Sequence, residues 1–386
     1  MYIQRLAEAA LQHSFQSSKV LIILGARQVG KTTLVQHFLR NKKVVYLNLD
    51  IGIDWNRLQA ATTLPPRDAL KSFGLPDVLV IDEAQRKPET SSMVKGWYDA
   101  QIPVKMILLG SSSLNLLHQS AENLTGRNEK LFLPPLLFKE IVASKSWYSP
   151  IFSEEQLQDS FHDPLQTLLL QSLVFGNYPE AVVTDEKETY LLNLVSDYLL
   201  KDVLQLGLVK TPDLILHLLR LLAHQVGSEV SVNELATNLG MARATIERYL
   251  ELLEQTFVIF RVPAFSTNPR KEISKSHKIY FWDTGIRNAL LKEFSMNALR
   301  PDIGMLWENW VVAEFAKINL LQGQKKNIFF WRSRAGSEVD LILKEGEHLL
   351  AYEIKWKPQA IKSKAFEAQY HTKVRLVDST RPLFPL

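Results

Sequence analysis

The strongest constraint in this sequence is an octapeptide bounded by glycine, which lies between an apolar run and a helical pattern. Residues 25–32 read GARQVGKT, with KVLIIL before them and TTLVQHFL after the lysine. A strand that turns tightly into a helix directs main-chain N–H groups and the positive end of the helix dipole into one concavity. The pattern GxxxxGK[ST] in this context predicts a cradle for polyphosphate. The alternative is a glycine-rich turn with an exposed lysine.

Each position of the loop has an expected role. Lys31 is expected to reach the β and γ phosphates, Thr32 to ligate Mg²⁺, and Thr33 to lie near the α phosphate. Two glycines allow the backbone to approach the phosphates closely. The predicted nucleotide-binding residues are Gly25, Ala26, Arg27, Gln28, Val29, Gly30, Lys31, Thr32 and Thr33.

A second element, residues 78–83 with the sequence VLVIDE, reads as a buried strand that ends in two acids. Asp82 is expected to hold the water shell of Mg²⁺, and Glu83 to polarise the water that attacks the γ phosphate. The alternative is a strand that ends at the surface.

Two further groups could complete this site. The apolar run 106–109 ends in Gly-Ser-Ser, where Ser112 or the preceding Ser111 would bond the γ phosphate or the attacking water, unless the serines only form a turn. Arg127 would supply a guanidinium to the transition state, within the subunit or across an interface. A solvated surface arginine is its alternative.

The chain has 386 residues without cysteine, of which 46% are hydrophobic and 22% charged. This composition excludes disulfide-stapled and disordered classes and predicts more than one core. Short apolar runs alternating with helical patterns predict a three-layer α/β domain with a parallel sheet over 1–149. Leucine-rich patterns predict a helical connector over 150–209, and a winged helix (210–295) and a small α/β domain (296–386) follow. No segment reads as a membrane span or a secretory signal, so a cytoplasmic protein is expected.

The winged-helix prediction rests on a capping box at Ser231, a turn at Gly240 and a helix with one apolar face, followed by a hairpin. Its loop is basic and predicted to track a DNA backbone, with Arg270, Lys271, Lys275 and Lys278. The candidate recognition helix also carries three glutamates, which DNA repels. A structural or protein-contacting role therefore stays open.

The carboxyl-terminal segment contains the spacing D…ExK in Asp340, Glu353 and Lys355. Strand alternation places the glutamate and the lysine on one face, where Asp340 on the neighbouring strand can join Glu353 around one Mg²⁺. Lys355 would activate water, Glu308 would complete the site, and Glu338 is a weaker candidate. From Lys355 to Leu386, seven Lys or Arg face two Asp or Glu, a net of +5, which would favour a phosphate backbone.

The histidines and two of the tryptophans could also bind a ligand, but they are expected to be structural. The nine histidines show no HExxH motif and no pair at i, i+4, so no zinc site is expected. Trp307 and Trp310 lie at helical spacing and are expected in a core.

The motifs GARQVGKTTL, VLVIDEAQ, ILLGSSS and LTGR, with the later FGNYPE and YLLKDVL, resemble a group of prokaryotic AAA-superfamily ATPases. Asn177 stands where that group has a second glycine. The resemblance implies ATP and Mg²⁺ as ligands and a carboxyl-terminal part that ends in a nuclease-like fold of the restriction-endonuclease type. Three functions follow: an ATPase coupled to DNA binding or processing, a nuclease gated by nucleotide, and a nucleotide-switched module that binds nucleic acid or a client protein without cleaving.

Overall fold

The computed structural model describes residues 2–111, 124–199, 212–266, 277–333, 335–361 and 363–383. The chain forms two compact units, residues 2–134 and residues 135–386. Within those described ranges, no helix combines the length and the apolar character that a bilayer crossing requires. The two units are described separately below.

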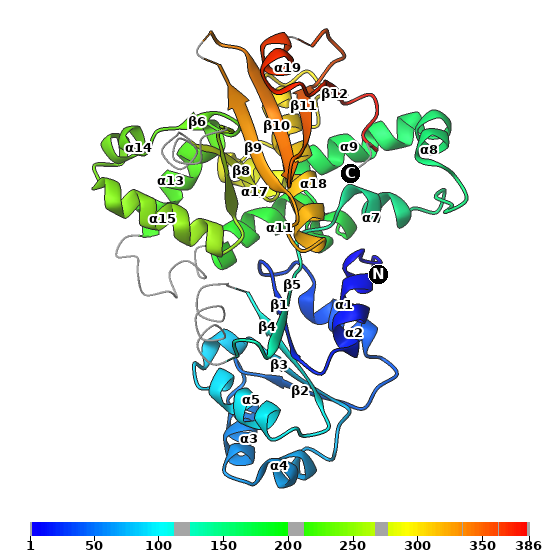
Figure 1. Cartoon of the computed structure of the whole chain (residues 1–386), viewed down its shortest axis with the longest axis vertical. Helices are drawn as coiled ribbons and strands as arrows, with labels where there is room; N and C mark the ends of the chain where they lie inside the picture. Colours follow the sequence, from blue (N-terminus) through cyan, green and yellow to red (C-terminus); the bar gives the residue numbers. More distant parts are fainter. Residues whose placement is uncertain are drawn as a thin grey trace. The chain divides into compact units, whose positions relative to one another are not determined.

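The first unit is built on a five-stranded parallel sheet in the order β2-β3-β4-β1-β5 (Figure 1). Strands β1, β3 and β4 are apolar on both faces, as the uninterrupted aliphatic runs predict. The strands are β1 (Val20–Leu24), β2 (Val44–Asn48), β3 (Val78–Asp82), β4 (Lys105–Gly110) and β5 (Asn128–Phe132). The helices are α1 (Ala7–Gln16), α2 (Lys31–Phe38), α3 (Gly52–Thr62), α4 (Pro66–Ser72), the 3-10 turn η1 (Ala84–Arg86) and α5 (Thr90–Asp99).

Strand β5 is an element that the sequence analysis did not predict. Among the described strands its neighbour is β1, so it forms the outer strand of the sheet. Its sequence, NEKLF, has polar residues at the first three positions, and Leu131 is its buried member. An edge strand needs little apolar surface, so its sequence carries a weak strand signal.

The second unit begins with helices, as predicted for the leucine-rich region. They are α7 (Phe138–Ala143), α8 (Glu154–Ser160), α9 (His162–Phe175), α10 (Pro179–Val183), α11 (Lys187–Asn193) and the π-helical η2 (Leu194–Leu199). Later helices are α13 (Pro212–His224), α14 (Val232–Leu239), α15 (Arg243–Gln255), α17 (Thr284–Leu291), α18 (Ile303–Leu321) and α19 (Lys364–Tyr370).

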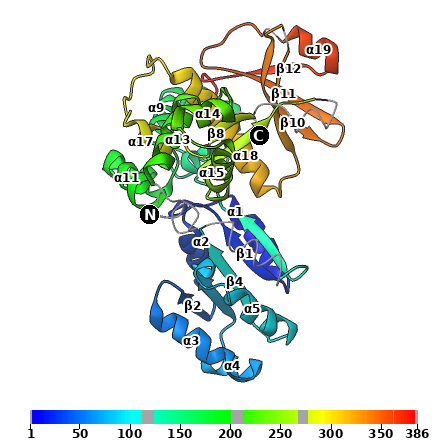
Figure 2. The ribbon, with the colours of Figure 1, turned by 90° about the vertical axis from the view of Figure 1, so that its left-hand side faces the viewer.

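Two sheets complete the second unit (Figure 2). Strands β6 (Glu229–Val230), β7 (Ile259–Pro263) and β8 (His277–Phe281) form an antiparallel sheet in the order β6-β8-β7. Strands β9 (Asn327–Arg332), β10 (Glu338–Glu345), β11 (His348–Lys355) and β12 (Val374–Asp378) form the other, in the order β12-β11-β10-β9. A hydrogen bond of 2.6 Å from the Phe265 amide to the Phe330 carbonyl joins them. The last three predicted parts thus lie in one compact unit, and their division at 149, 209 and 295 stays a prediction.

Helix α18 lies in the core of the second unit. Trp307 and Trp310 are 0% and 3% exposed and stack with ring centroids 5.2 Å apart, so their prediction as core residues is confirmed. Glu314 and Lys317 on the same helix are also buried and form an ion pair of 2.9 Å. These side chains bond the segment that enters the unit: Glu314 accepts from the Phe138 amide at 2.9 Å, and Lys317 donates to the Leu136 carbonyl at 3.2 Å.

Candidate functional site

The strand order of the first unit gathers the predicted site residues at one edge of the sheet. Strand β4 lies between β1 and β3, and all three are parallel. Their carboxyl ends therefore meet. Strand β1 leads into the loop 25–30, β4 leads into Ser111, and β3 ends in Asp82, which Glu83 follows. Ligands of open parallel sheets bind at this edge.

The loop needs glycine at its first position because another part of the chain occupies the space. A Cβ on Gly25 would lie 2.2 Å from the carbonyl oxygen of Leu133, the residue that follows β5. The loop then turns through two left-handed residues, Gln28 with φ 62° and Gly30 with φ 92°, and Gly30 caps α2. The expected strand, glycine turn and helix are therefore present.

Lys31 is buried and folded back over the loop. Its ammonium group donates hydrogen bonds to the carbonyls of Gly25 at 2.8 Å and Ala26 at 2.9 Å. Both of these partners are main-chain carbonyls of the loop itself, so the cationic side chain lies at the centre of the loop. This is the charge that the predicted contact with phosphate requires.

The predicted magnesium ligands Thr32 and Asp82 are in contact. The Thr32 hydroxyl donates to a carboxylate oxygen of Asp82 at 2.6 Å, and the other carboxylate oxygen accepts from the Glu83 amide at 2.9 Å. A hydroxyl and a carboxylate are hard oxygen donors of the kind that Mg²⁺ prefers. The two residues therefore fit the ion. Thr33 lies exposed on the first turn of α2.

Gln85 connects two of the predicted residues, and the sequence analysis gave it no role. Its side-chain amide donates to the Glu83 carboxylate at 2.5 Å and to the Ser111 hydroxyl at 3.0 Å. Glu83 itself has a left-handed backbone, with φ 53°. The contact holds the expected base beside the end of β4. A glutamine two residues after the acid was the available signal. Ser112 lies outside the described residues.

Arg127 lies at the amino ends of the strands, whereas the loop lies at their carboxyl ends. Its carbonyl accepts from the amide of Val20, the first residue of β1, while the loop follows the last. Its guanidinium pairs with Asp99 at 2.6 Å. The five residues of β1 separate the two edges by roughly 15 Å. Within its own subunit Arg127 therefore does not reach the loop 25–30, which corrects that alternative, and a role across an interface stays a prediction.

In the second unit, the residues of the D…ExK pattern come together on β10 and β11. Asp340 is 4% exposed and Glu353 7%. One oxygen of Asp340 accepts from the Ile354 amide at 2.7 Å and from the Lys355 ammonium at 2.9 Å. Lys355 also lies 3.7 Å from Glu353. Burial lowers the pKa of Lys355, but Asp340 and Glu353 raise it, and the net pKa is above its ordinary value.

Glu308 joins this cluster through a lysine that the sequence analysis assigned elsewhere. Lys278 on β8 is 3% exposed and its ammonium pairs with Glu308 at 3.0 Å and Glu338 at 2.6 Å. Tyr280 donates to Glu308 at 2.7 Å. The prediction that Lys278 contacts DNA is therefore wrong, because strand alternation turns its side chain into the interior. Arg270, Lys271 and Lys275 lie outside the described residues.

These ion pairs bear on whether Mg²⁺ fits the second cluster. Burial lowers the pKa of Lys278, but Glu308, Glu338 and Asp340 raise it, and the net pKa is above its ordinary value, so the ammonium stays charged. Lysines hold one oxygen of Asp340 and one of Glu308. Among the described residues, no three acidic or imidazole side chains converge as metal ligands. The donors are of the right type, but lysines occupy part of their capacity.

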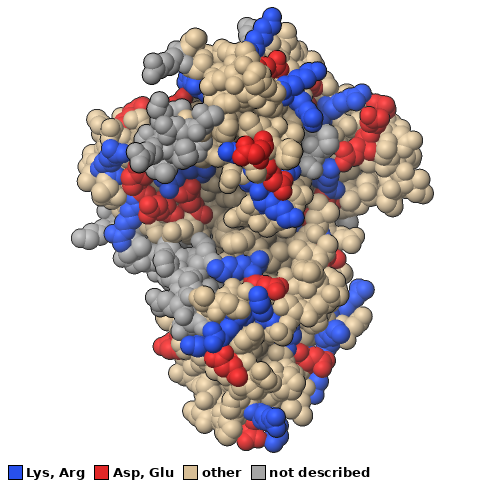
Figure 3. Space-filling model, in the orientation of Figure 1, with Lys and Arg blue, Asp and Glu red and all other residues tan. Residues whose placement is uncertain are grey.

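Helices α14 and α15 show the expected turn and apolar face. Ser231 caps α14 through the Glu234 amide at 3.3 Å, and Gly240 is left-handed with φ 62°. The apolar face of α15 is buried, with Ile246, Leu250 and Leu253. Figure 3 shows acidic side chains gathered over α15. Arg261 on β7 pairs with two of its carboxylates, Glu254 at 2.6 Å and Glu247 at 3.3 Å.

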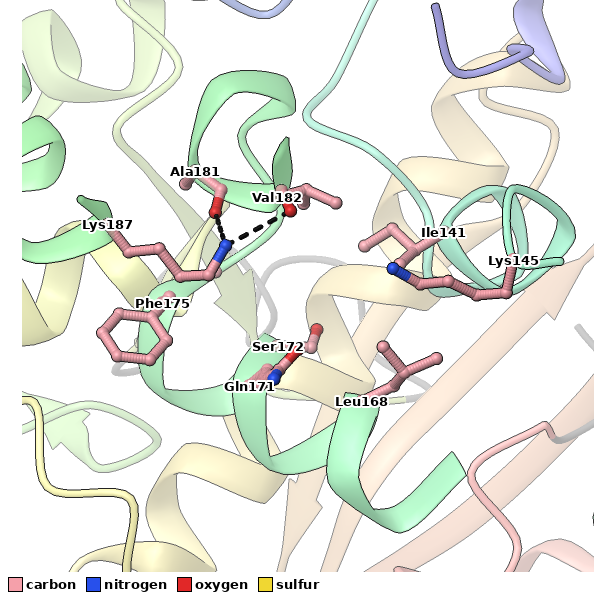
Figure 4. Close-up of a pocket in the computed structure, with 10 residues that line it drawn as sticks. Ile141, Lys145, Leu168, Gln171, Ser172, Phe175, Ala181, Val182 and Lys187 are labelled. Atoms are coloured by element: carbon pink, nitrogen blue, oxygen red, sulfur yellow. Dashed lines mark hydrogen bonds between the residues drawn. The ribbon is translucent and has the colours of Figure 1, made fainter. Parts of the chain in front are cut away.

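A pocket beside α9 is lined by two lysines (Figure 4). The ammonium of Lys187 donates to the carbonyls of Ala181 at 2.6 Å, Val182 at 3.2 Å and Thr184 at 2.8 Å, so its three protons are used. Burial lowers the pKa of Lys187, and the charge of Lys145 lowers it further. The cavity volume is about 20 Å³, which leaves room for about one water molecule. Lys187 therefore has a structural role, as it caps the carboxyl-terminal end of α10.

Comparison with known proteins divides the chain into three matched segments. Residues 17–142 match a family model described as an AAA domain. Residues 166–297 and 303–381 match two domains of unknown function, DUF8612 and DUF4143. The first segment contains the loop, Asp82 and Glu83.

Relatives occur in bacteria and archaea. An uncharacterized protein of Mycobacterium tuberculosis is 27% identical over 91% of this chain and 74% of its own length. Another, from Methanocaldococcus jannaschii, is 28% identical over 91% of this chain and 78% of its own. A Walker-type ATPase of Pyrococcus abyssi has a similar structure, with a TM-score of 0.51 and 15% identity over 75% of this chain and 96% of that one. Residues 17–142 are therefore similar to an AAA domain, and the amino-terminal part of this chain has the fold of a P-loop ATPase, with a five-stranded parallel sheet.

Proposed function

We propose that the protein binds ATP and hydrolyses it with Mg²⁺ at the carboxyl edge of the first sheet. The observation that carries the proposal is the contact of Thr32 with Asp82 at 2.6 Å, beside a buried Lys31 that donates to the loop carbonyls of Gly25 and Ala26. The loop N–H groups and Lys31 would bind the β and γ phosphates. Thr32 and Asp82 would hold Mg²⁺, which supplies charge neutralisation on the phosphates.

Glu83 and Gln85 are suited to manage the attacking water. Glu83 would accept a proton from the water as its oxygen bonds to the γ phosphorus and the bond to the β–γ bridging oxygen breaks. The products are ADP and phosphate. Gln85 donates to the Glu83 carboxylate and so orients it. The Ser111 hydroxyl accepts a hydrogen bond from the same glutamine and adds a third polar side chain beside Glu83.

The test is steady-state ATP turnover of the full chain and of Lys31→Ala, each with and without DNA, RNA and candidate client proteins. The variant should lose turnover by at least about 100-fold, because it lacks the cation that binds the transferred phosphoryl group. Equal rates for the two proteins would contradict the assignment of the site. A stimulating polymer would identify the client class.

We further propose that the second unit combines a winged helix with a restriction-endonuclease-like fold and that its client is DNA. Support comes from the order α13, α14, α15, β7, β8 with β6 closing a small sheet, and from the mixed sheet that carries Asp340 and Glu353. The basic stretch 355–386 and the loop residues Lys271 and Lys275 would contact phosphates. Charge reversal of the two loop lysines should weaken DNA retention and flatten its dependence on salt; unchanged retention would remove the loop from the interface.

The ion pairs of Lys278 favour a binding module without cleavage over a nuclease. An ammonium already compensates Glu308 and Glu338, and a second one compensates Asp340. Plasmid and single-stranded DNA incubated with Mg²⁺ or Mn²⁺, with and without ATP, should stay intact. Cleavage that disappears in Lys355→Ala would instead establish the nuclease, with Asp340, Glu353 and Glu308 as its metal ligands and Lys355 as the group that activates water.

A further inference from the structure

An arginine from the segment before α1 reaches the phosphate loop. Arg5 is 5% exposed, and its guanidinium donates from Nη1 to the Val29 carbonyl at 2.9 Å and from Nη2 to the Pro134 carbonyl at 2.6 Å. Its own segment is fixed by Glu8, which accepts from the Arg5 amide at 3.2 Å and from the Tyr2 hydroxyl at 2.6 Å. The guanidinium therefore joins two carbonyls that are 105 residues apart in sequence.

The bond to Val29 fixes the orientation of one loop peptide. The carbonyl of Val29 and the amide of Gly30 belong to the same planar trans peptide, in which C=O and N–H point in opposite directions. A donor that holds the oxygen on one side therefore directs the Gly30 N–H to the other side. Gly30 has φ 92° and no Cβ, so the peptide on its amino side has more rotational freedom than one before any other residue. A hydrogen bond from outside the loop, such as the one from Arg5, can therefore fix the orientation of this peptide.

The bond to Pro134 connects the same guanidinium to the end of the unit. Leu133 donates to the Leu24 carbonyl at 2.7 Å, and its own carbonyl lies against Gly25. Pro134 and Pro135 follow, and two consecutive prolines restrict the backbone to few conformations. Both ends of the phosphate loop, at Gly25 and at Val29, thus contact the two residues with which the chain leaves the first unit.

We infer that Arg5 is a positioning residue for the phosphate loop, which orients the Val29–Gly30 peptide toward the phosphates and couples nucleotide binding to the conformation of residues 133–134. The inference rests on the proposed nucleotide site and assigns to it a group outside the loop motif. Arg5 itself touches neither phosphate nor water in this scheme. Its effect is on the affinity for nucleotide, because a misoriented Gly30 amide removes one donor from the cradle.

The experiment compares Arg5→Met with Lys105→Met in the full chain. Lys105 is a matched control, since its ammonium also donates to main-chain carbonyls, those of Ser14, Ser17 and Lys19, but at the amino edge of the same sheet. Dissociation constants for ATP and ADP are measured by calorimetry, together with thermal unfolding. Arg5→Met should weaken nucleotide binding about tenfold, the value of one lost hydrogen bond of about 1.4 kcal/mol, and Lys105→Met should leave it unchanged.

A second variant and a second readout separate positioning from folding. Arg5→Lys keeps the charge but cannot bridge both carbonyls with a planar fork, so it should fold and show an intermediate affinity. Hydrogen exchange should show that nucleotide slows the amides of Gly30 and Leu133 together in the parent and only that of Gly30 in Arg5→Lys. Equal affinities for Arg5→Met and Lys105→Met would overturn the inference and leave the site intact. A parent protein that binds no nucleotide would overturn the proposed function as well.

Discussion

Lys31 in the first unit and Lys278 in the second are both ammonium groups that are less than a tenth exposed, but their partners differ in charge. Lys31 is held by two carbonyls, and Lys278 by two carboxylates. A carbonyl satisfies the hydrogen bond and leaves the charge, whereas a carboxylate satisfies both. The first lysine therefore lies among the main-chain groups of the loop where phosphate is proposed to bind, while the second compensates acids of its own unit.

The largest effect is expected on turnover at the first lysine's site. Glu83→Gln removes the carboxylate that accepts the proton and keeps an amide of the same shape, so ATP hydrolysis should fall by about 10²- to 10⁴-fold. Nucleotide binding should persist, because Lys31 and the loop are unchanged. Rate and affinity are measured on one preparation; equal losses of both would mean that Glu83 supports the loop and is no base.

A matched pair of lysine variants tests the difference in charge compensation directly. Lys278→Met removes a buried cation and leaves the half-buried Glu308 and Glu338 without their partner, so it should lower the free energy of unfolding by about 3 kcal/mol. Lys31→Met breaks hydrogen bonds to two neutral carbonyls, each worth about 1 kcal/mol, so it should cost less stability but should lose nucleotide binding. Denaturant unfolding of both variants measures the contrast.

The double variant Lys278→Met/Glu308→Gln is the control for this contrast. It removes one carboxylate charge together with the ammonium, and it should recover part of the stability that the single variant lost. No recovery would mean that Lys278 contributes by packing and not by charge.

A smaller effect is expected for the glycine that lets the loop approach β5. Gly25→Ala places a Cβ 2.2 Å from the Leu133 carbonyl and should cost about 1–3 kcal/mol through forced backbone shifts. Gly52→Ala in α3 is the control, because no atom lies within 4 Å of its added Cβ. Equal melting temperatures for the two variants would contradict the close approach of Gly25 to the Leu133 carbonyl.

The smallest effect concerns acid pH in the second unit. Burial raises the pKa of Asp302, but Arg300 and Arg287 lower it, and the net pKa lies below its ordinary value. A depressed pKa means that the ionised Asp302 stabilises the folded state above its unfolded pKa, and that this stability is lost as the pH falls through the folded pKa. Asp302→Asn should therefore be about 1–2 kcal/mol less stable than the parent at neutral pH. The difference in denaturant midpoint should begin to shrink below about pH 4, the ordinary pKa of an aspartate, and should disappear only below the lower pKa of the folded state. A difference that stays constant over this range would show that the ionised carboxylate does not contribute.

The predictable parts of the molecule were those with a local signal. The loop 25–32 and the apolar run before Asp82 determine their own geometry, because glycine spacing and aliphatic periodicity act within one element. The assignments of Gln85 and Arg5 needed the tertiary structure, since their partners come from other elements.

Lys278 is the clearest case of a residue whose environment depends on partners that are distant in the sequence. In the sequence it lies beside a basic loop and resembles its neighbours Arg270, Lys271 and Lys275. Its interior position follows from pairing with β7 and from acids on α18 and β10, which are 30 and 60 residues away. Local composition does not contain that information.

Helix α18 connects two buried polar groups of the second unit. The same rigid rod carries Glu308 in the acidic cluster and Glu314 with Lys317, which grip the peptide groups of residues 136 and 138. Six residues, or about 9 Å of helix, separate the two glutamates. Because packed interiors transmit strain, a shift of residues 136–138 along this helix would also displace the acidic cluster at Glu308.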